Sequence, residues 1–243
     1  MSRRVLVTRP RPGAEATARR LEAMGLEPLV VPLSETVPLP PPEELPAVPD
    51  AVAVTSANAL RHAPPQLLER LVTLPCFAVG EATAAAAREA GFADVATGSG
   101  DAAGLAVHAA AALKPGARLL HLCGRVRLSD FEALLAEAGI VVLPVETYDS
   151  RSVGDVSDEL LRAAGGGAVD AVLLHSATAA AAMTDLLALP ALRNLFESTR
   201  FYAMSNRIAT TLGDAGGRQV SISEEPNESA LLARLAGDCG NPP

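Results

Sequence analysis

Short apolar runs alternate with Ala-rich stretches along most of the chain. The first two runs cover residues 5–9 and 29–33, and the amphipathic pattern between them predicts a helix from about Ala14 to Met24 that ends at Gly25. Runs of this length, rich in Val and Leu, are typical of buried strands. Buried strands that alternate with helices predict parallel sheets covered on both faces.

The same alternation continues to the end of the chain. Further strands are predicted at residues 51–55, 76–79, near 95, 118–122, 141–145, 171–174, 201–204 and 219–223. Helices are predicted between them, at about residues 82–90, 102–113, 129–138, 155–164 and 229–235 and in the segments that follow residues 55, 174 and 204. The fold class is therefore α/β.

One segment of the chain occurs twice. Residues 50–60 read DAVAVTSANAL and residues 170–180 read DAVLLHSATAA, and the segments that follow, FAVGEATA at 77–84 and YAMSNRIA at 202–209, also correspond. The duplication predicts two related α/β units with a ligand held between them.

The proline-rich stretch between residues 38 and 49 excludes a helix or a central strand, which predicts a linker. Two strands before it cannot form a stable sheet alone, whereas the chain after Tyr148 offers three more. We therefore predict one discontinuous domain, residues 1–36 with 151–243, and an inserted domain, residues 37–148. Each domain has five parallel strands in a flavodoxin-like order, joined by a two-segment linker, with the ligand cleft between the domains.

The composition excludes several classes of partner. A formal net charge of −8 and an aromatic content of 3% without Trp argue against nucleic acid. No apolar run approaches the roughly 20 residues that a membrane span needs, and the charged N-terminus leads directly into a strand rather than a signal peptide. We therefore expect a cytoplasmic monomer that binds a small molecule. Three widely separated cysteines predict neither a disulfide framework nor a zinc site.

Candidate ligand residues lie at the predicted carboxyl ends of the strands, where open parallel sheets bind ligands. These residues are small, carry hydroxyls or carry guanidinium groups, and they are Thr8, Arg9, Thr55, Ser56, Ala57, Asn58, Gly80, Thr83, Gly124, Arg125, Ser176, Ser205 and Arg207. Helix-start amides and arginines suit an anion with several carboxylates. For any single hydroxyl residue, the alternative is that it only caps a helix.

Other chemistries fit the sequence less well. The motif GSGDAA at residues 98–103 has dinucleotide-binding spacing, but no acidic residue ends the next strand. Ser56 and Ser176 lack the Gly-x-Ser-x-Gly motif, and none of the four histidines has an evident partner in the sequence. A dinucleotide enzyme and a serine hydrolase are therefore not favoured.

Tyr148 is one of only two tyrosines and falls where the second linker crosses between the predicted domains. A phenol with a reference pKa of about 10 stays protonated at neutral pH, so it could donate a proton to a leaving hydroxyl. The alternative is that Tyr148 only braces the connection between the domains.

The order of these motifs resembles the uroporphyrinogen-III synthase family. The resemblance is carried by LVTRP at residues 6–10, TSANA at 55–59, AVG at 78–80 with Thr83-Ala84, and ETY at 146–148. It implies that hydroxymethylbilane, a linear tetrapyrrole with acetate and propionate arms, loses its terminal hydroxyl as water and closes with inversion of the last pyrrole ring. It also implies that no metal or organic cofactor takes part.

The resemblance also implies roles for individual residues. Backbone amides near Ser56–Asn58, Gly80–Thr83 and Ser176–Ala177 would hold the carboxylates, Tyr148 would assist departure of the hydroxyl, and the domains would hinge about the paired linkers. His175, Ser205 and Ile208 depart from the family pattern, which leaves the contacts of the discontinuous domain less defined. The alternative function is a non-catalytic two-domain module that binds or senses a small anion.

Overall fold

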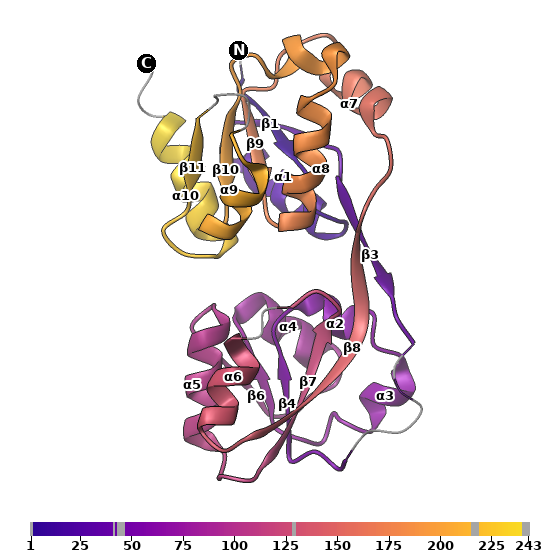
Figure 1. Ribbon diagram of the computed structural model, residues 1–243, viewed down its shortest axis with the longest axis vertical. Helices are drawn as coiled ribbons and strands as arrows, with labels where there is room; N and C mark the ends of the chain where they lie inside the picture. The colour runs from indigo at the N-terminus through magenta and orange to yellow at the C-terminus, as the bar shows by residue number, and fades with distance from the viewer. Residues whose placement is uncertain (1, 41, 43–46, 128–129, 215–218, 240–243) are drawn as a thin grey trace. The chain divides into compact units, whose positions relative to one another are not determined.

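The computed structural model describes residues 2–40, 42, 47–127, 130–214 and 219–239. The chain divides into two compact units, one made of Met1–Glu35 with Arg151–Pro243 and the other of Thr36–Ser150 (Figure 1). We call them the discontinuous unit and the inserted unit. Thr36 and residues 149–150, which the sequence analysis placed outside the inserted domain, belong to it by this division.

The discontinuous unit is built on a parallel sheet with the strand order β11-β10-β9-β1-β2. Its strands are β1 (Arg4–Val7), β2 (Glu27–Val30), β9 (Ala171–Leu174), β10 (Arg200–Ala203) and β11 (Val220–Ile222). Its helices are α1 (Gly13–Ala23), α7 (Ser157–Ala164), α8 (Ala177–Leu187), the 3-10 helix Pro190–Phe196, α9 (Asn206–Leu212) and α10 (Glu228–Cys239). Counted along the chain within this unit, the order is 2-1-3-4-5, which confirms the predicted flavodoxin-like sheet.

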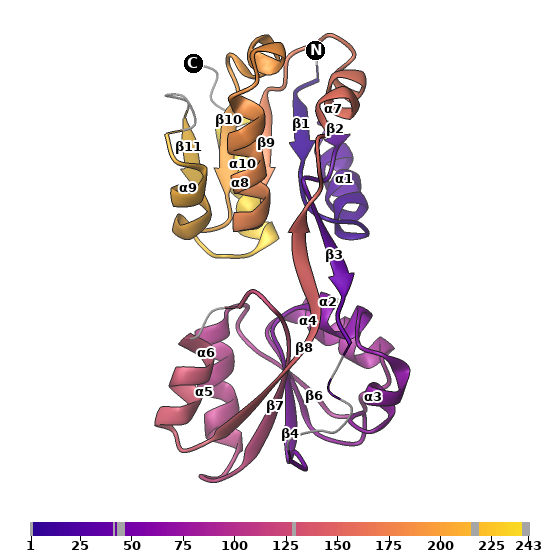
Figure 2. The ribbon, with the colours of Figure 1, turned by 45° about the vertical axis from the view of Figure 1, so that its right-hand side comes forward.

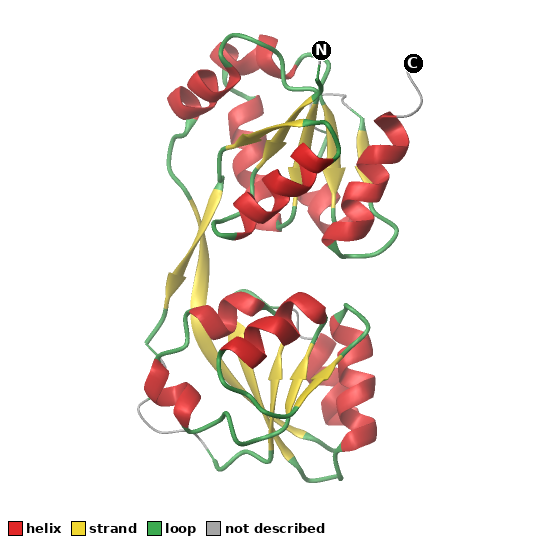
Figure 3. Cartoon of the chain, turned by 180° about the vertical axis from the view of Figure 1, so that it is seen from behind, coloured by secondary structure: helices red, strands yellow, loops and turns green. Residues whose placement is uncertain are grey.

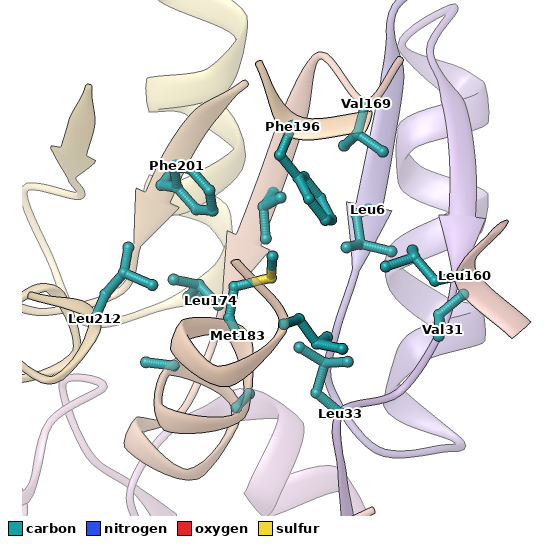
Figure 4. Close-up of a cluster of buried hydrophobic side chains, with 14 of the residues drawn as sticks. Leu6, Val31, Leu33, Leu160, Val169, Leu174, Met183, Phe196, Phe201 and Leu212 are labelled. Carbon is teal, nitrogen blue, oxygen red and sulfur yellow. The ribbon is translucent and has the colours of Figure 1, made fainter. Parts of the chain in front are cut away.

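Side chains that alternate along these strands build one apolar layer on each face of the sheet. Leu6, Leu174 and Phe201 pack with residues of α7, α8 and the 3-10 helix, as Figure 4 shows. Val5 and Leu173 point to the opposite face and pack with α1 and α10. Each fully buried side chain of this size contributes about 1.5–3 kcal/mol to the stability of the fold. Because both faces of the sheet are buried, consecutive residues of a strand are apolar rather than alternating with polar ones.

The inserted unit has a sheet with the strand order β3-β8-β7-β4-β5-β6. Its strands are β3 (Ser34–Pro38), β4 (Ala51–Val54), β5 (Cys76–Ala78), β6 (Val95–Thr97), β7 (Arg118–Gly124) and β8 (Val141–Ser152). Its helices are α2 (Ala57–Arg61), α3 (Pro65–Glu69), α4 (Glu81–Glu89), α5 (Ala102–Ala112) and α6 (Asp130–Glu137). The strands from β8 to β6 pair in parallel.

The parallel strands of the two sheets have the same spatial order, but the first strand along the chain takes a different place in each sheet. If β7 is counted as the first strand of the inserted unit, its five parallel strands also follow the order 2-1-3-4-5. This equivalence matches the likeness of residues 4–25 to residues 118–139. Apolar layers again cover both faces of the sheet, one with α2 and α4 and one with α5 and α6 (Figure 3).

The strand β3 was not expected, because it enters the stretch interpreted as a linker. It lies at the edge of the sheet beside β8 and runs in the opposite direction (Figure 2). Pro38 is the last residue of this edge strand, where proline's lack of an amide hydrogen costs no hydrogen bond between strands. β8 also continues to Ser152, well beyond the predicted end at residue 145. Residues 41 and 43–46 of the predicted linker lie outside the described residues.

Two helical segments differ from the sequence analysis because of proline. The helix predicted after residue 55 is divided into α2 and α3, and Pro65 takes the first position of α3, where no amide hydrogen is needed. The 3-10 helix starts at Pro190 and was not predicted. Residues 240–243 lie outside the described residues. No helix in the described part of the chain is long and apolar enough to cross a bilayer.

Candidate active site

Serine side chains cap three of the helices that start at the carboxyl ends of strands. Each serine oxygen accepts a hydrogen bond from an amide in the first turn: Ser56 from Asn58 at 3.2 Å, Ser176 from Ala179 at 3.1 Å and Ser205 from Ile208 at 3.4 Å. These contacts stabilise the helix starts. All three hydroxyls therefore act as helix caps, and ligand binding by the adjoining backbone amides stays a prediction.

Two other helix starts at the carboxyl ends have no such cap. Among the described residues, no side chain caps the first turn of α4, whose N-cap is Gly80, or of α1, whose N-cap is Pro12. Amides in the first turn of a helix lack partners within the helix and attract anions. Thr83 lies in that turn of α4, with its side chain buried. The start of α4 at Gly80–Thr83 therefore lacks a side-chain cap, and carboxylate binding there stays a prediction.

Thr8 and Arg9 follow β1 but have different surroundings. Thr8 is fully buried, and its hydroxyl donates to the carbonyl oxygen of Leu173 at 2.7 Å, which ties β1 to β9. Arg9 is partly exposed, and its Nη1 lies 3.2 Å from the carboxylate of Glu228. The Thr8 hydroxyl is thus used within the fold, whereas the Arg9 guanidinium reaches the surface of the discontinuous unit.

Glu228, the first residue of α10, is the centre of a cluster in the discontinuous unit. Its carboxylate contacts the guanidinium groups of Arg9 at 3.2 Å and Arg20 at 3.1 Å, and it accepts a hydrogen bond from the hydroxyl of Thr17. Burial alone would raise the pKa of Glu228, but His175, Thr17 and Arg9 outweigh it and lower the pKa to about 2. Glu228 is therefore ionised at neutral pH and binds α10 to α1.

His175 takes the place in the second copy that Thr55 has in the first. Its side chain is 7% exposed, and its Nε2 lies 3.9 Å from the Glu228 carboxylate, beyond hydrogen-bond distance. Neither ring nitrogen has a hydrogen-bond partner among the described residues. Burial lowers the pKa of His175, so the ring is neutral at neutral pH.

In the inserted unit, Tyr148 lies at the carboxyl end of the sheet. It pairs with Gly124 across β7 and β8, and a Cβ atom added to Gly124 would lie 2.7 Å from Cζ of the tyrosine ring. The ring also stacks against His62, with the centroids 5.9 Å apart. Gly124 is thus required for the tyrosine to occupy this position. Both residues came from the sequence analysis, but their direct contact did not.

The Tyr148 phenol is protonated at neutral pH. Burial raises its pKa, which a hydrogen bond with the Ser56 side chain opposes without reversing. The structure therefore brings together Tyr148, Ser56 and Gly124 from β8, the start of α2 and the end of β7. A buried phenol of this kind can donate a proton but cannot act as a base near pH 7.

The Thr55 hydroxyl lies 3.0 Å from Nε2 of His121, which projects from β7. On the other side of the ring, Nδ1 of His121 lies 3.5 Å from the carboxylate of Glu132 in α6. Arg127 holds that carboxylate through Nε at 2.8 Å. Burial lowers the pKa of His121 to about 4, although Glu132 acts in the opposite direction. The imidazole therefore contacts the hydroxyl on one side and faces the carboxylate on the other, where Nδ1 makes no hydrogen bond among the described residues.

Further charged side chains lie along the end of β8 and are linked to Glu132 through Arg127. Arg127 also contacts Glu146 at 2.8 Å, and Arg125 lies 3.5 Å from Glu146 and 3.3 Å from Asp149. Half of the Arg125 side chain is exposed, at 53%. Arg125 is thus more accessible than Arg127, and its guanidinium group contacts two carboxylates of the protein.

The remaining predicted site residues occupy separate positions. The carboxamide of Asn58 accepts a hydrogen bond from Arg61 at 3.1 Å, and Ala57 and Ala177 are the first residues of α2 and α8. Arg207 is exposed in α9. Ile208, in the same helix, is buried in the core of the discontinuous unit.

The acidic partners of both histidines were not predicted from the sequence, and neither Glu132 nor Glu228 was singled out as a candidate. Eleven positions separate His121 from Glu132, so their contact depends on how α6 packs onto β7. The distance along the chain from Thr17 to Glu228 is 211 positions. Alternation identified the strand ends, but it carried no signal for helix partners of this kind.

The cysteine side chains that the structure describes belong to the core. Cys76 and Cys123 are buried free thiols, and burial raises their pKa values to about 12 and about 11. They are therefore protonated and unreactive at neutral pH. No group of three or more His, Cys, Asp or Glu side chains within the described ranges is placed so that it could hold a metal ion.

Comparisons with known proteins give a consistent assignment. The family described as uroporphyrinogen-III synthase HemD matches residues 15–233. A uroporphyrinogen-III synthetase structure from Helicobacter pylori is 20% identical, has a TM-score of 0.65, and the match covers 98% of this chain and 100% of that one. A mutant uroporphyrinogen III synthase structure from Thermus thermophilus is 21% identical, has a TM-score of 0.51, and the match covers 99% and 100%.

At such identities the two structures support the shared two-domain α/β fold and nothing finer. No curated protein sequence matches the chain. The family match extends from within α1 to within α10, so it includes nearly all of both units. The chain belongs to the uroporphyrinogen-III synthase family.

Proposed function

We propose that this chain closes hydroxymethylbilane to uroporphyrinogen III by binding the substrate carboxylates at the carboxyl ends of both sheets. Family membership makes the chain a cyclising lyase of tetrapyrrole biosynthesis, and the match over residues 15–233 is the observation that carries the proposal. The same match gives no support to the alternative of a non-catalytic module that binds a small anion.

Backbone amides are the proposed carboxylate donors. In the inserted unit these are the amides of Ser56–Asn58 and of the uncapped start of α4 at Gly80–Thr83. In the discontinuous unit they are the amides of Ser176–Ala177 at the start of α8, with Arg9 as a nearby cation and Ser205 and Arg207 at the start of α9. Main-chain donors at helix starts favour anions without requiring a lysine, and the chain contains only one, Lys114.

Tyr148 is the proposed proton donor to the departing hydroxyl. Its phenol stays protonated at neutral pH because burial raises its pKa. Loss of water also requires the bond between the oxygen and the hydroxymethyl carbon on the terminal pyrrole to break, and the electron-rich pyrrole assists that step itself by stabilising the positive charge left on this carbon. Tyr148 therefore needs to supply only part of the acceleration.

Holding the chain in one conformation is the main proposed contribution of the protein. Without an enzyme, closure gives the symmetric isomer, so formation of the type III isomer requires that the hindered carbon of the last ring is held close to the reacting methylene carbon. Fixing two reacting groups in such a geometry can lower the activation barrier by a large amount. Carboxylate contacts at several points along the substrate are suited to this task.

The proposal is tested by supplying enzymatically generated hydroxymethylbilane to the purified protein and separating the porphyrin isomers after oxidation. We expect an excess of the type III isomer that increases with protein concentration. Formation of the symmetric isomer alone would contradict the proposal.

The cytoplasmic location, the monomeric state and the absence of a nucleic-acid partner stay predictions. The acidic composition, with a formal charge of −8, supports the last of these. Light scattering on the purified protein and fractionation of producing cells would test the first two.

A further inference from the structure

The Thr55 hydroxyl is one of the proposed substrate contacts, yet it has a protein partner. Its oxygen lies 3.0 Å from Nε2 of His121, and among the described residues His121 is its only hydrogen-bond partner. Thr55 is partly exposed, whereas His121 is 1% exposed. The buried ring thus holds the hydroxyl from within the unit, and the oxygen lone pairs remain for a group outside it.

The surroundings of His121 decide which ring nitrogen carries the hydrogen. Nδ1 makes no hydrogen bond among the described residues but lies 3.5 Å from a carboxylate oxygen of Glu132, and Arg127 holds this carboxylate in place at 2.8 Å. A hydrogen on Nδ1 is attracted to the carboxylate, whereas a lone pair on Nδ1 would be repelled by it. The favoured tautomer therefore has the hydrogen on Nδ1 and a free lone pair on Nε2.

A neutral ring with this tautomer can only accept a hydrogen bond at Nε2. The ring is neutral at pH 7 because burial lowers its pKa to about 4. The Thr55 hydroxyl must then be the donor in the contact with His121. Its single hydrogen is used, so Thr55 can offer a ligand only its lone pairs.

Resting on the proposed function, we propose that His121 is a positioning residue that fixes the Thr55 hydroxyl as a hydrogen-bond acceptor for a pyrrole N–H of the tetrapyrrole. The substrate carboxylates need donors, so they are directed to the backbone amides of Ser56–Asn58 and Gly80–Thr83. Its pyrrole rings carry N–H donors and need acceptors. Thr55 and the amides would thus recognise two different parts of the same molecule.

The tautomer can be measured by NMR on the full-length protein. The chain has four histidines, so labelling histidine with nitrogen-15 gives four pairs of ring nitrogen signals, which substitution of His62, His108 and His175 by Gln would assign. We expect a protonated Nδ1 and an unprotonated, hydrogen-bonded Nε2 in His121 at pH 7. A protonated Nε2, or a ring protonated on both nitrogens, would overturn the proposal.

Addition of uroporphyrinogen III then tests the assigned contact. If Thr55 accepts from a pyrrole N–H, its hydrogen stays on the bond to His121 and the Nε2 resonance keeps its hydrogen-bonded position. If Thr55 instead donates to a substrate carboxylate, Nε2 loses its partner and the resonance moves to that of a free imidazole nitrogen, which would also overturn the proposal. The tautomer in the free protein is measurable even if the isomer assay fails, so the two failures are distinguishable.

A matched pair of variants gives the kinetic test. Thr55→Ser keeps the hydroxyl and is expected to retain the wild-type KM, whereas Thr55→Val is expected to raise KM about tenfold with a smaller change in kcat. His121→Phe is expected to raise KM in the same direction, because the hydroxyl is then free to rotate. Equal KM values for the Ser and Val variants would contradict the proposal.

Discussion

The carboxyl ends of the two sheets contain the same set of groups in different arrangements. In each unit a buried neutral histidine faces a carboxylate that arginine holds, His121 with Glu132 in the inserted unit and His175 with Glu228 in the discontinuous unit. In the inserted unit the histidine lies one strand away and binds the hydroxyl of Thr55. In the discontinuous unit the histidine replaces that hydroxyl.

The origin of the carboxylate differs as well. Glu132 lies in α6, which directly follows β7 along the chain, whereas Glu228 lies in α10, at the end of the chain. In the discontinuous unit Arg9 and Arg20 are both bound to Glu228, and the Thr8 hydroxyl is bound within the sheet. The equivalent side chains of the discontinuous unit thus mainly join its own elements, and we expect the side chains that take part in the chemistry to lie in the inserted unit.

The largest expected difference between the two units is in how the free energy of unfolding depends on acid pH. The folded-state pKa of His121 is about 4 and its unfolded value is 6.5, so the unfolded chain takes up a proton that the folded chain does not. Stability therefore falls as the pH decreases from about 6.5 to about 4, by roughly 3 kcal/mol at most. Urea unfolding of the wild type and of His121→Phe over this range measures this contribution.

The variant should lose less stability than the wild type between pH 7 and pH 4.5. Burial lowers the pKa of His175 too, so some of the loss remains in the variant. Glu228 acts in a different window, because its pKa is lowered from 4.5 to about 2 and the stability that it contributes is lost below about pH 4.5. Identical pH profiles for the two proteins would show that His121 is not buried in a neutral form.

Replacement of Tyr148 by Phe tests the catalytic difference between the units. We expect formation of the type III isomer to slow about 100-fold, at the lower end of the range for a positioned acid, because the pyrrole itself assists departure of the hydroxyl. The free energy of unfolding should change by about 1 kcal/mol or less, since one hydrogen bond with Ser56 is lost.

Gly124→Ala is the companion of this variant. It keeps the phenol but forces the ring to move, because the new Cβ would lie 2.7 Å from Cζ of Tyr148. We expect a loss of rate in the same direction as in the Phe variant. An unchanged rate in Tyr148→Phe would remove this residue from the mechanism.

Glu228→Gln tests the structural use of the cluster in the discontinuous unit. The amide cannot neutralise Arg9 and Arg20, so we expect the free energy of unfolding to fall by about 2 kcal/mol, less than for a fully buried pair because 22% of the side chain is exposed. Glu81→Gln is the control, because the pair of Glu81 with Arg88 is largely exposed and should matter by about 0.5 kcal/mol or less.

Both measurements use urea unfolding at pH 7 and low salt. Equal effects of the two substitutions would show that the cluster is an ordinary surface ion pair.

The smallest expected effect comes from the two equivalent serine caps. Ser56→Ala and Ser176→Ala each remove one cap contact and should each cost about 1 kcal/mol of stability. Only Ser56 is also a neighbour of Tyr148, so only its variant should lower kcat. A similar loss of kcat in both variants would indicate that the two units contribute equally to the chemistry.

Strand ends, the parallel sheets and the order of the discontinuous sheet were predictable from the sequence, because buried parallel strands read as apolar runs. The edge strand β3 was not, since an exposed edge tolerates a proline-rich sequence that resembles a linker. Thr55, Ser56 and Tyr148 were predicted as site residues from their places after or beside strands, and their roles stay predictions. Glu132 and Glu228 were not, because helix packing decides which side chain meets each histidine.

Hydrogen exchange at the backbone amides tests the central claim that both carboxyl ends bind one substrate. On addition of uroporphyrinogen III, we expect slower exchange for the amides near Ser56–Asn58 and Gly80–Thr83 and also for those near Ser176–Ala177. Slower exchange in the inserted unit alone would contradict the claim, since the substrate would then be held without the second sheet.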